Sequence, residues 1–272
     1  MNIMQKFVWY IFKKTSLSLA ALTMLAMSHV SAERPFITDD AALSGFRRSE
    51  LASWIFASKT GTEFWHSANL GLTNWAELTI AGTWGRSKYE FNGETFREFS
   101  YTLPLLQAKF LIRGYEPNGL PGVGVAVGAD MPWGKGAFVS NGYGAFGTVL
   151  LTQCFGMNEN LLIHAQAGGT YLKEKESKEQ RLGLVFGIGA QVKVYRGFHL
   201  IGEIVNGDPY EHGAGSMYQL GIRQFVSDHL QLDLAFGSGI SNDTRASSWV
   251  TGGIRYVLSF DKSNRNGRRI TT

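Results

Sequence analysis

The stretch "LGLVFGIGAQVKVY", residues 182–195, gives the clearest indication of the fold. Apolar side chains occupy the even-numbered positions from Leu182 to Val194, whereas glycine, glutamine and lysine fill most of the odd-numbered ones. Successive side chains of a strand point to opposite faces, so this pattern predicts a strand with one continuous apolar face. No helical stripe in the sequence is available to cover that face, and we therefore interpret it as facing lipid.

The same alternation recurs along the chain. It is clear in "LLQAKFLIRG" (105–114), "GVGVAVGAD" (122–130), "LQLDLAFG" (230–237) and "VTGGIRYVLSF" (250–260). About twelve strand-sized segments of this kind are typical of an all-β fold, a transmembrane antiparallel β-barrel, which we place over residues 45–260. A soluble β-sandwich, whose strands also alternate, is the main alternative.

The connections between segments favour the barrel, because bacterial outer-membrane barrels have short periplasmic turns and longer outer loops. Short connections are predicted at 71–74, 115–121, 157–160, 196–197 and 227–229. Longer ones are predicted at 85–100, 131–141, 171–181, 206–215 and 239–247. Aromatic residues lie near many segment ends, as the interfacial girdles of such barrels require.

The two ends of the chain have their own composition. Residues 1–32 contain three lysines and no acid, then the apolar run "LSLAALTMLAM" and the small residues "VSA", which predicts a signal peptide cleaved after Ala32. A membrane anchor is the alternative, but the apolar run is shorter than the roughly 20 residues needed to span a bilayer. Cleavage would leave 23 basic and 22 acidic residues, so charge gives no argument for nucleic-acid binding. Residues 261–272 form a basic tail.

The mature start resembles a known family. "RPFITDDAA" (34–42) directly after a signal peptide, "GLTNWAELTIAG" (71–82) and "GIRQFVSDHLQLDLAFGSG" (221–239) resemble the outer-membrane family named for the MetA pathway of phenol degradation. The resemblance implies a barrel in the outer membrane of a Gram-negative bacterium. It also implies passage of small, often aromatic or hydrophobic molecules, without naming the solute.

The face opposite the lipid-facing residues carries charges of both signs on neighbouring strands. We expect cross-strand pairs between Glu77 and Lys109 or Arg113, between Lys193 and Glu203, and around Asp233. A charge ladder that only fills the barrel is the alternative, because buried charges must be paired whatever the function. The predicted lumen ring comprises Glu77, Lys109, Arg113, Lys193, Glu203, Arg223, Asp233 and Arg255.

The ring is basic by two charges, and this suggests a role for residues 33–44. We predict that this N-terminal segment, with Arg34, Asp39 and Asp40, folds back into the periplasmic mouth as a plug. The two aspartates would pair with arginines of the ring such as Arg113, Arg223 or Arg255. A linker without fixed structure is the alternative.

Other candidate chemistry is sparse. His66 and Ser67 are neighbours on a strand and point to opposite faces, so we predict neither a nucleophile–base pair nor an enzyme. The six histidines show no metal spacing, the single Cys154 cannot form an internal disulfide, and no cofactor is predicted. Loop 172–181 is a solvated stretch that could also bind divalent cations or lipopolysaccharide.

Two functions remain open. The first is a narrow passive channel for small, hydrophobic or aromatic solutes. The second is a non-conducting barrel with a structural or lipid-modifying role. The expected partners are membrane lipids, lipopolysaccharide and a small solute, and the sequence does not indicate an oligomeric state.

Overall fold

The computed structural model describes residues 36–91, 94–240 and 248–260. The predicted signal peptide, Arg34 and the predicted tail 261–272 lie outside these residues. The described ranges contain no helix that is long and apolar enough to cross a membrane.

Twelve long strands and one two-residue strand account for the regular structure of the described residues. In chain order they are β1 (Arg48–Ser58), β2 (Gly61–Gly71), β3 (Ala76–Phe91), β4 (Glu94–Arg113), β5 (Gly122–Asp130), β6 (Gly134–Lys135), β7 (Gly142–Phe155), β8 (Leu161–Glu174), β9 (Gln180–Tyr195), β10 (Phe198–Asp208), β11 (Glu211–Phe225), β12 (Leu230–Gly239) and β13 (Trp249–Ser259).

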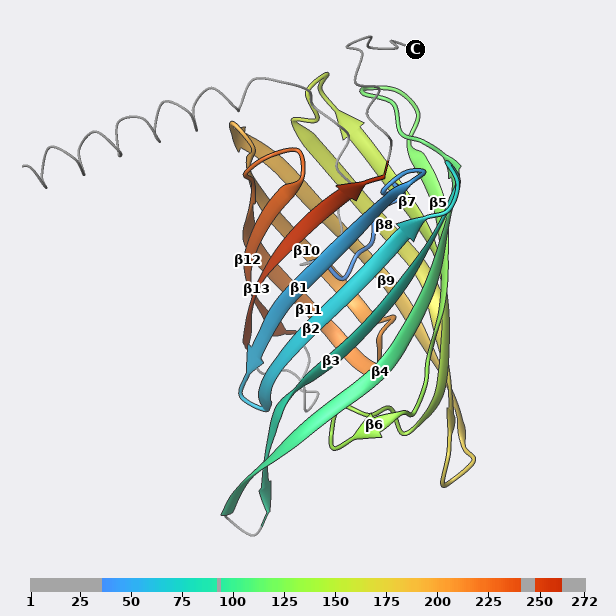
Figure 1. The fold of residues 1–272 in the computed structure, drawn as a ribbon, viewed down its shortest axis with the longest axis vertical. Helices are drawn as coiled ribbons and strands as arrows, with labels where there is room; N and C mark the ends of the chain where they lie inside the picture. Colours follow the sequence, from blue (N-terminus) through green and yellow to red (C-terminus); the bar gives the residue numbers. More distant parts are fainter. Residues whose placement is uncertain (1–35, 92–93, 241–247, 261–272) are drawn as a thin grey trace, which may run out of the picture. The chain divides into compact units, whose positions relative to one another are not determined.

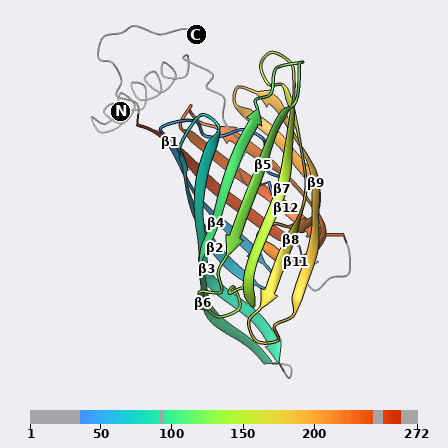
Figure 2. The same ribbon diagram turned by 90° about the vertical axis from the view of Figure 1, so that its right-hand side faces the viewer.

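The twelve long strands close into one antiparallel barrel. Each pairs with the next long strand along the chain, and β1 also pairs with β13, from Arg48 opposite Ser259 to Ser58 opposite Trp249. Figures 1 and 2 show the tilted strands wrapping around a single lumen. The short β6 pairs only with the middle of β4. The predicted fold class is therefore confirmed.

Alternating side chains separate the two faces of the wall. On β9, Phe186 and Ile188 are more than half exposed, whereas Val185, which precedes Phe186 on the same strand, points to the other face and is 2% exposed. On β7, Leu150 and Thr152 face inward and are fully buried, and their neighbours Val149 and Leu151 face outward. The apolar residues of the sequence pattern thus form the outer surface, and glycine, polar and charged residues form the inner one.

The prediction of longer outer loops is wrong in three places. Most of 85–100, 171–181 and 206–215 is strand. β3 continues to Phe91 and β4 begins at Glu94, and short turns join β8 to β9 and β10 to β11. These ends are polar and glycine-rich, but they keep their cross-strand pairing. In Figure 1 the β3–β4 hairpin extends past the neighbouring strands. Polarity marks where a strand leaves the apolar layer, and here it does not mark where the strand ends.

Candidate functional site

Residues 36–44 lie inside the barrel, and Figure 1 shows them as a blue trace behind β1 and β2. They contain no strand or helix, so their backbone groups need partners elsewhere. Phe36, Thr38, Asp40 and Ala41 are each at most 3% exposed. The segment is therefore enclosed by the wall residues, and its hydrogen bonds show how it is held.

Glu203, on the inner face of β10, binds the start of the segment. Its two carboxylate oxygens accept hydrogen bonds from the backbone N–H groups of Ile37 and Thr38, each at 2.8 Å. The Gln219 side chain donates to the same carboxylate at 2.6 Å. Hydrogen bonds to a charged group are the stronger kind, so Glu203 is a principal attachment point.

Glycines on β9 leave the space that this part of the segment fills. A Cβ atom at Gly187 would lie 2.6 Å from the Thr38 hydroxyl, and one at Gly189 would lie 3.2 Å from the Phe36 ring. The Phe36 ring also contacts His164 edge-on at 5.9 Å, and the Arg223 guanidinium lies 5.6 Å from its centre. The small odd-numbered residues of β9 therefore accommodate the segment.

Lys109, which is completely buried on β4, binds the middle of the segment. Its ammonium group donates to Asp39 at 2.8 Å and lies 3.7 Å from both Asp40 and Glu77. It also donates to the carbonyl of Ala42 at 3.3 Å. Burial raises the pKa of Asp39, and the charge of Lys109 partly offsets this effect. Lys109 is thus the cation that several buried carboxylates share.

Further wall residues hold the rest of the segment. Gln166 accepts from the Asp39 backbone N–H at 3.0 Å and donates to the Ile37 carbonyl at 3.2 Å. The Thr152 hydroxyl accepts from the backbone of Ala41 at 2.9 Å. At the far end, both the backbone N–H and the hydroxyl of Ser44 donate to Glu77.

The ion pairs of the segment differ from the prediction. The partner of Asp39 is Lys109 and not one of the three arginines named. Arg223 instead pairs with Asp233 at 2.8 Å, as the cross-strand prediction had it. Arg255 pairs at 3.0 Å with Glu50, a residue that the prediction missed. Glu50 alternates with apolar Leu51 on β1, so the same pattern could have identified it.

Two predicted ring residues lie at the rim instead. A β-bulge between Leu111 and Arg113 shifts the register by one residue, so that Arg113 pairs with Val123 on the outward face of β5. Arg113 is exposed and donates to the Pro121 carbonyl. Lys193 contacts the Asn158 carbonyl at 3.5 Å, whereas Glu203, its predicted partner, binds the segment. A bulge cannot be read from simple alternation, which explains the error at Arg113.

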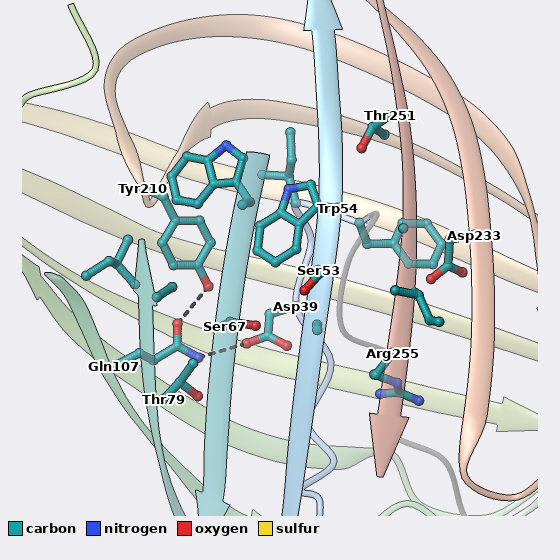
Figure 3. A pocket seen from close by; sticks show the side chains of 18 residues that line it. Asp39, Ser53, Trp54, Ser67, Thr79, Gln107, Tyr210, Asp233, Thr251 and Arg255 are labelled. Carbon is teal, nitrogen blue, oxygen red and sulfur yellow. Dashed lines mark hydrogen bonds between the residues drawn. The ribbon is translucent and has the colours of Figure 1, made fainter. Parts of the chain in front are cut away.

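A cavity remains beside the segment, and Figure 3 shows the side chains that line it. Its volume is about 840 Å³ together with the space open to solvent. The rings of Trp54 and Trp65 stack at 5.6 Å along one side. Tyr210 donates to Gln107 at 2.7 Å, and Gln107 in turn reaches Asp39 at 3.5 Å. The cavity thus combines aromatic walls with a polar edge formed by Tyr210, Gln107 and, from the segment, Asp39.

A serine–histidine contact does occur, but on the outer surface and with a different serine. Ser53 of β1 lies 3.0 Å from Nδ1 of His66, and the Trp84 indole donates to Nε2 at 3.1 Å. An indole N–H only donates, so Nε2 must be an acceptor and the proton of neutral His66 is on Nδ1. In this tautomer His66 donates to Ser53 and cannot take its proton. Among the described residues, no group of three His, Cys, Asp or Glu side chains could hold a metal ion.

Comparison with known proteins identifies solved structures of the same fold. An outer-membrane channel from Pseudomonas putida F1 is 10% identical with a TM-score of 0.60, and the match covers 86% of this chain and all of that one. The KdgM porin is 8% identical with a TM-score of 0.53, over 76% of this chain and 98% of its own. The NanC porin is 9% identical with a TM-score of 0.50, over 77% of this chain and 100% of its own. No family model and no curated protein matches the sequence.

Proposed function

We propose that this protein is a narrow channel of the bacterial outer membrane in which residues 36–44 act as a gate. The observation that carries the proposal is the segment itself, bound across the lumen by Glu203, Lys109 and Glu77. The segment belongs to no strand and is attached to the wall through side chains, so its release leaves the strand ladder intact. The likeness of the fold to outer-membrane channels and porins supports this assignment.

The proposed solutes are small and hydrophobic or aromatic. Trp54 and Trp65 present aromatic surface to the cavity next to the gate, and Phe36 and Ile37 of the segment line its other side. A passing aromatic molecule would gain stacking contacts there before it displaces the segment. The outer-membrane family named for the MetA pathway of phenol degradation, which the sequence motifs resemble, agrees with this solute class, and we propose membership of it.

The same proposal assigns the remaining parts of the chain. Residues 1–32 would direct export and be removed after Ala32, and the strand ends nearest residues 36–44 would face the periplasm. We propose no enzymatic activity, a view that the tautomer of His66 supports. Membrane lipids, lipopolysaccharide and the solute are the proposed partners.

Two measurements on the refolded mature protein test the gate and the solute class. Deletion of residues 33–44 should raise single-channel conductance and the entry of glucose into liposomes, because it removes the obstruction while the barrel stays folded. Native protein should admit phenyl glucoside faster than glucose despite its larger size, and Trp54→Ala should abolish that preference. If neither the native nor the deleted protein conducts, the barrel is a structural one and the channel proposal is wrong.

A further inference from the structure

A groove on the outer surface, away from the lumen, gathers positive charge over aromatic rings. It lies across β2, β3 and β4 near the end opposite residues 36–44, with a volume of about 960 Å³ together with the space open to solvent. Phe64, Trp84 and Phe99 provide its aromatic part. Its cations are Lys59, Arg86, Lys88 and Arg97.

Three successive cross-strand pairs between β3 and β4 change from aromatic to cationic. Trp84 is opposite Tyr101, then Arg86 is opposite Phe99, and then Lys88 is opposite Arg97. Each step advances about 6.6 Å toward the end of the hairpin, at two residues per step. Trp84 is also fixed in place, since it stacks on Phe64 at 4.5 Å. Along the hairpin, aromatic rings are thus followed by cations. This order is expected where a barrel surface passes from the hydrocarbon layer to the lipid headgroups.

The cations of the groove have no anionic partner among the side chains that the structure describes. Its described lining residues include no carboxylate, and none of the ion pairs among described residues involves Arg86, Lys88 or Arg97. Lys88 and Arg97 are directly opposite on adjacent strands, an arrangement that destabilises a strand pair by itself. A bound anion would remove this repulsion.

We propose that this groove binds the phosphate groups of an anionic lipid of the outer leaflet, namely lipopolysaccharide. The inference rests on the proposed outer-membrane location, which places this end of the barrel in the outer leaflet. Arg86 and Arg97 would bind phosphate oxygens through their planar guanidinium groups, and Lys59 and Lys88 would add charge. Phe64, Trp84 and Phe99 would pack against the acyl chains below the headgroup. The solvated loop 172–181, for which lipopolysaccharide binding is only an alternative, is a separate surface.

The test compares binding of purified lipopolysaccharide to the refolded native protein and to Arg86→Gln/Lys88→Gln/Arg97→Gln. The triple variant should bind on the order of 100-fold more weakly, since each cation near an anionic headgroup strengthens binding several-fold. Arg47→Gln/Arg113→Gln/Arg196→Gln is the control with the same loss of charge; these three exposed arginines lie at the opposite end of the barrel, before β1, at the end of β4 and between β9 and β10, and the control should bind like the native protein. Native protein should bind enzymatically dephosphorylated lipopolysaccharide weakly, and inorganic phosphate should compete poorly.

Equal binding by the two triple variants would overturn the site, as would equal affinity for the dephosphorylated lipid. Tight binding of inorganic phosphate alone would assign the groove to a free anion, and dimerisation that depends on the same cations would assign it to a second protein copy. Either result would contradict the lipid proposal. Conductance measured on the same samples separates this inference from the channel, because a non-conducting barrel can still bind lipopolysaccharide and a conducting one can fail to do so.

Discussion

Substitution of Glu203 by glutamine should release the segment from the wall of the lumen. The native carboxylate accepts from the backbone N–H groups of Ile37 and Thr38 at 2.8 Å, and from Gln219 at 2.6 Å on the oxygen that Ile37 also uses. Glutamine keeps the shape but has only one acceptor oxygen. If that oxygen stays with Ile37, the new amide NH₂ faces the Thr38 N–H, and two donors oppose each other.

The expected size follows from this lost contact. A hydrogen bond to a charged group contributes about 1.5–3 kcal/mol, which corresponds to about a 10- to 150-fold increase in the population with the segment displaced. Ala41→Cys reports that population, because Ala41 is 1% exposed in the bound segment. In a background with Cys154→Ser, an impermeant maleimide should label this cysteine faster by the same factor when Glu203→Gln is added.

The matched control is Glu176→Gln, which removes one negative charge from the exposed β8–β9 turn. It should leave the labelling rate unchanged, and the heat-modifiable gel shift should show a folded barrel in both variants. An unchanged labelling rate in Glu203→Gln would mean that these two hydrogen bonds do not hold the segment in place.

Three further substitutions test the role of Lys109, the buried Arg223–Asp233 pair and the outward face of β9. Lys109→Met leaves several buried carboxylates without their shared cation, at a cost of about 3–5 kcal/mol, so it should raise conductance more than Asp39→Asn does; the reverse order would contradict the role of Lys109. Asp233→Asn breaks a buried ion pair and should lower the free energy of unfolding in urea by about 3–5 kcal/mol, whereas Glu174→Gln, in a more exposed pair, should change it by at most about 1 kcal/mol. Ile188→Arg should destabilise insertion into vesicles by about 2–4 kcal/mol and Ile188→Leu should not, and similar values for both would mean that this face does not contact lipid.

Much of the wall could be predicted because each of its rules is local. Alternation along β9 identified the lipid-facing side chains, and the opposite signs of Arg223 and Asp233 on adjacent strands identified their pair. The β-bulge that turns Arg113 outward has no such signal, and neither has the continuation of β3 to Phe91 beyond the apolar layer.

The contacts of residues 36–44 were harder to predict because they are not local. Glu203 is more than 160 residues from the backbone groups that it binds, and the segment has no period of its own. Charge alone suggested arginine partners for the aspartates, whereas the register of β4 places Lys109 nearest to them. Neutral residues such as Gln166 and Thr152 hold the backbone without any charge that would single them out.

The most direct test of the gate is a reversible link between the segment and the wall. A Cβ atom at Gly122 would lie 3.4 Å from that of Ala41, close to the usual separation of about 3.5–4.5 Å in disulfides. Single-channel recordings of Ala41→Cys/Gly122→Cys, in the Cys154→Ser background, should show no openings when the pair is oxidised and should show openings after a reductant is added. Each single-cysteine variant should be insensitive to both reagents. Equal conductance before and after reduction of a verified disulfide would contradict the claim that residues 36–44 gate this channel.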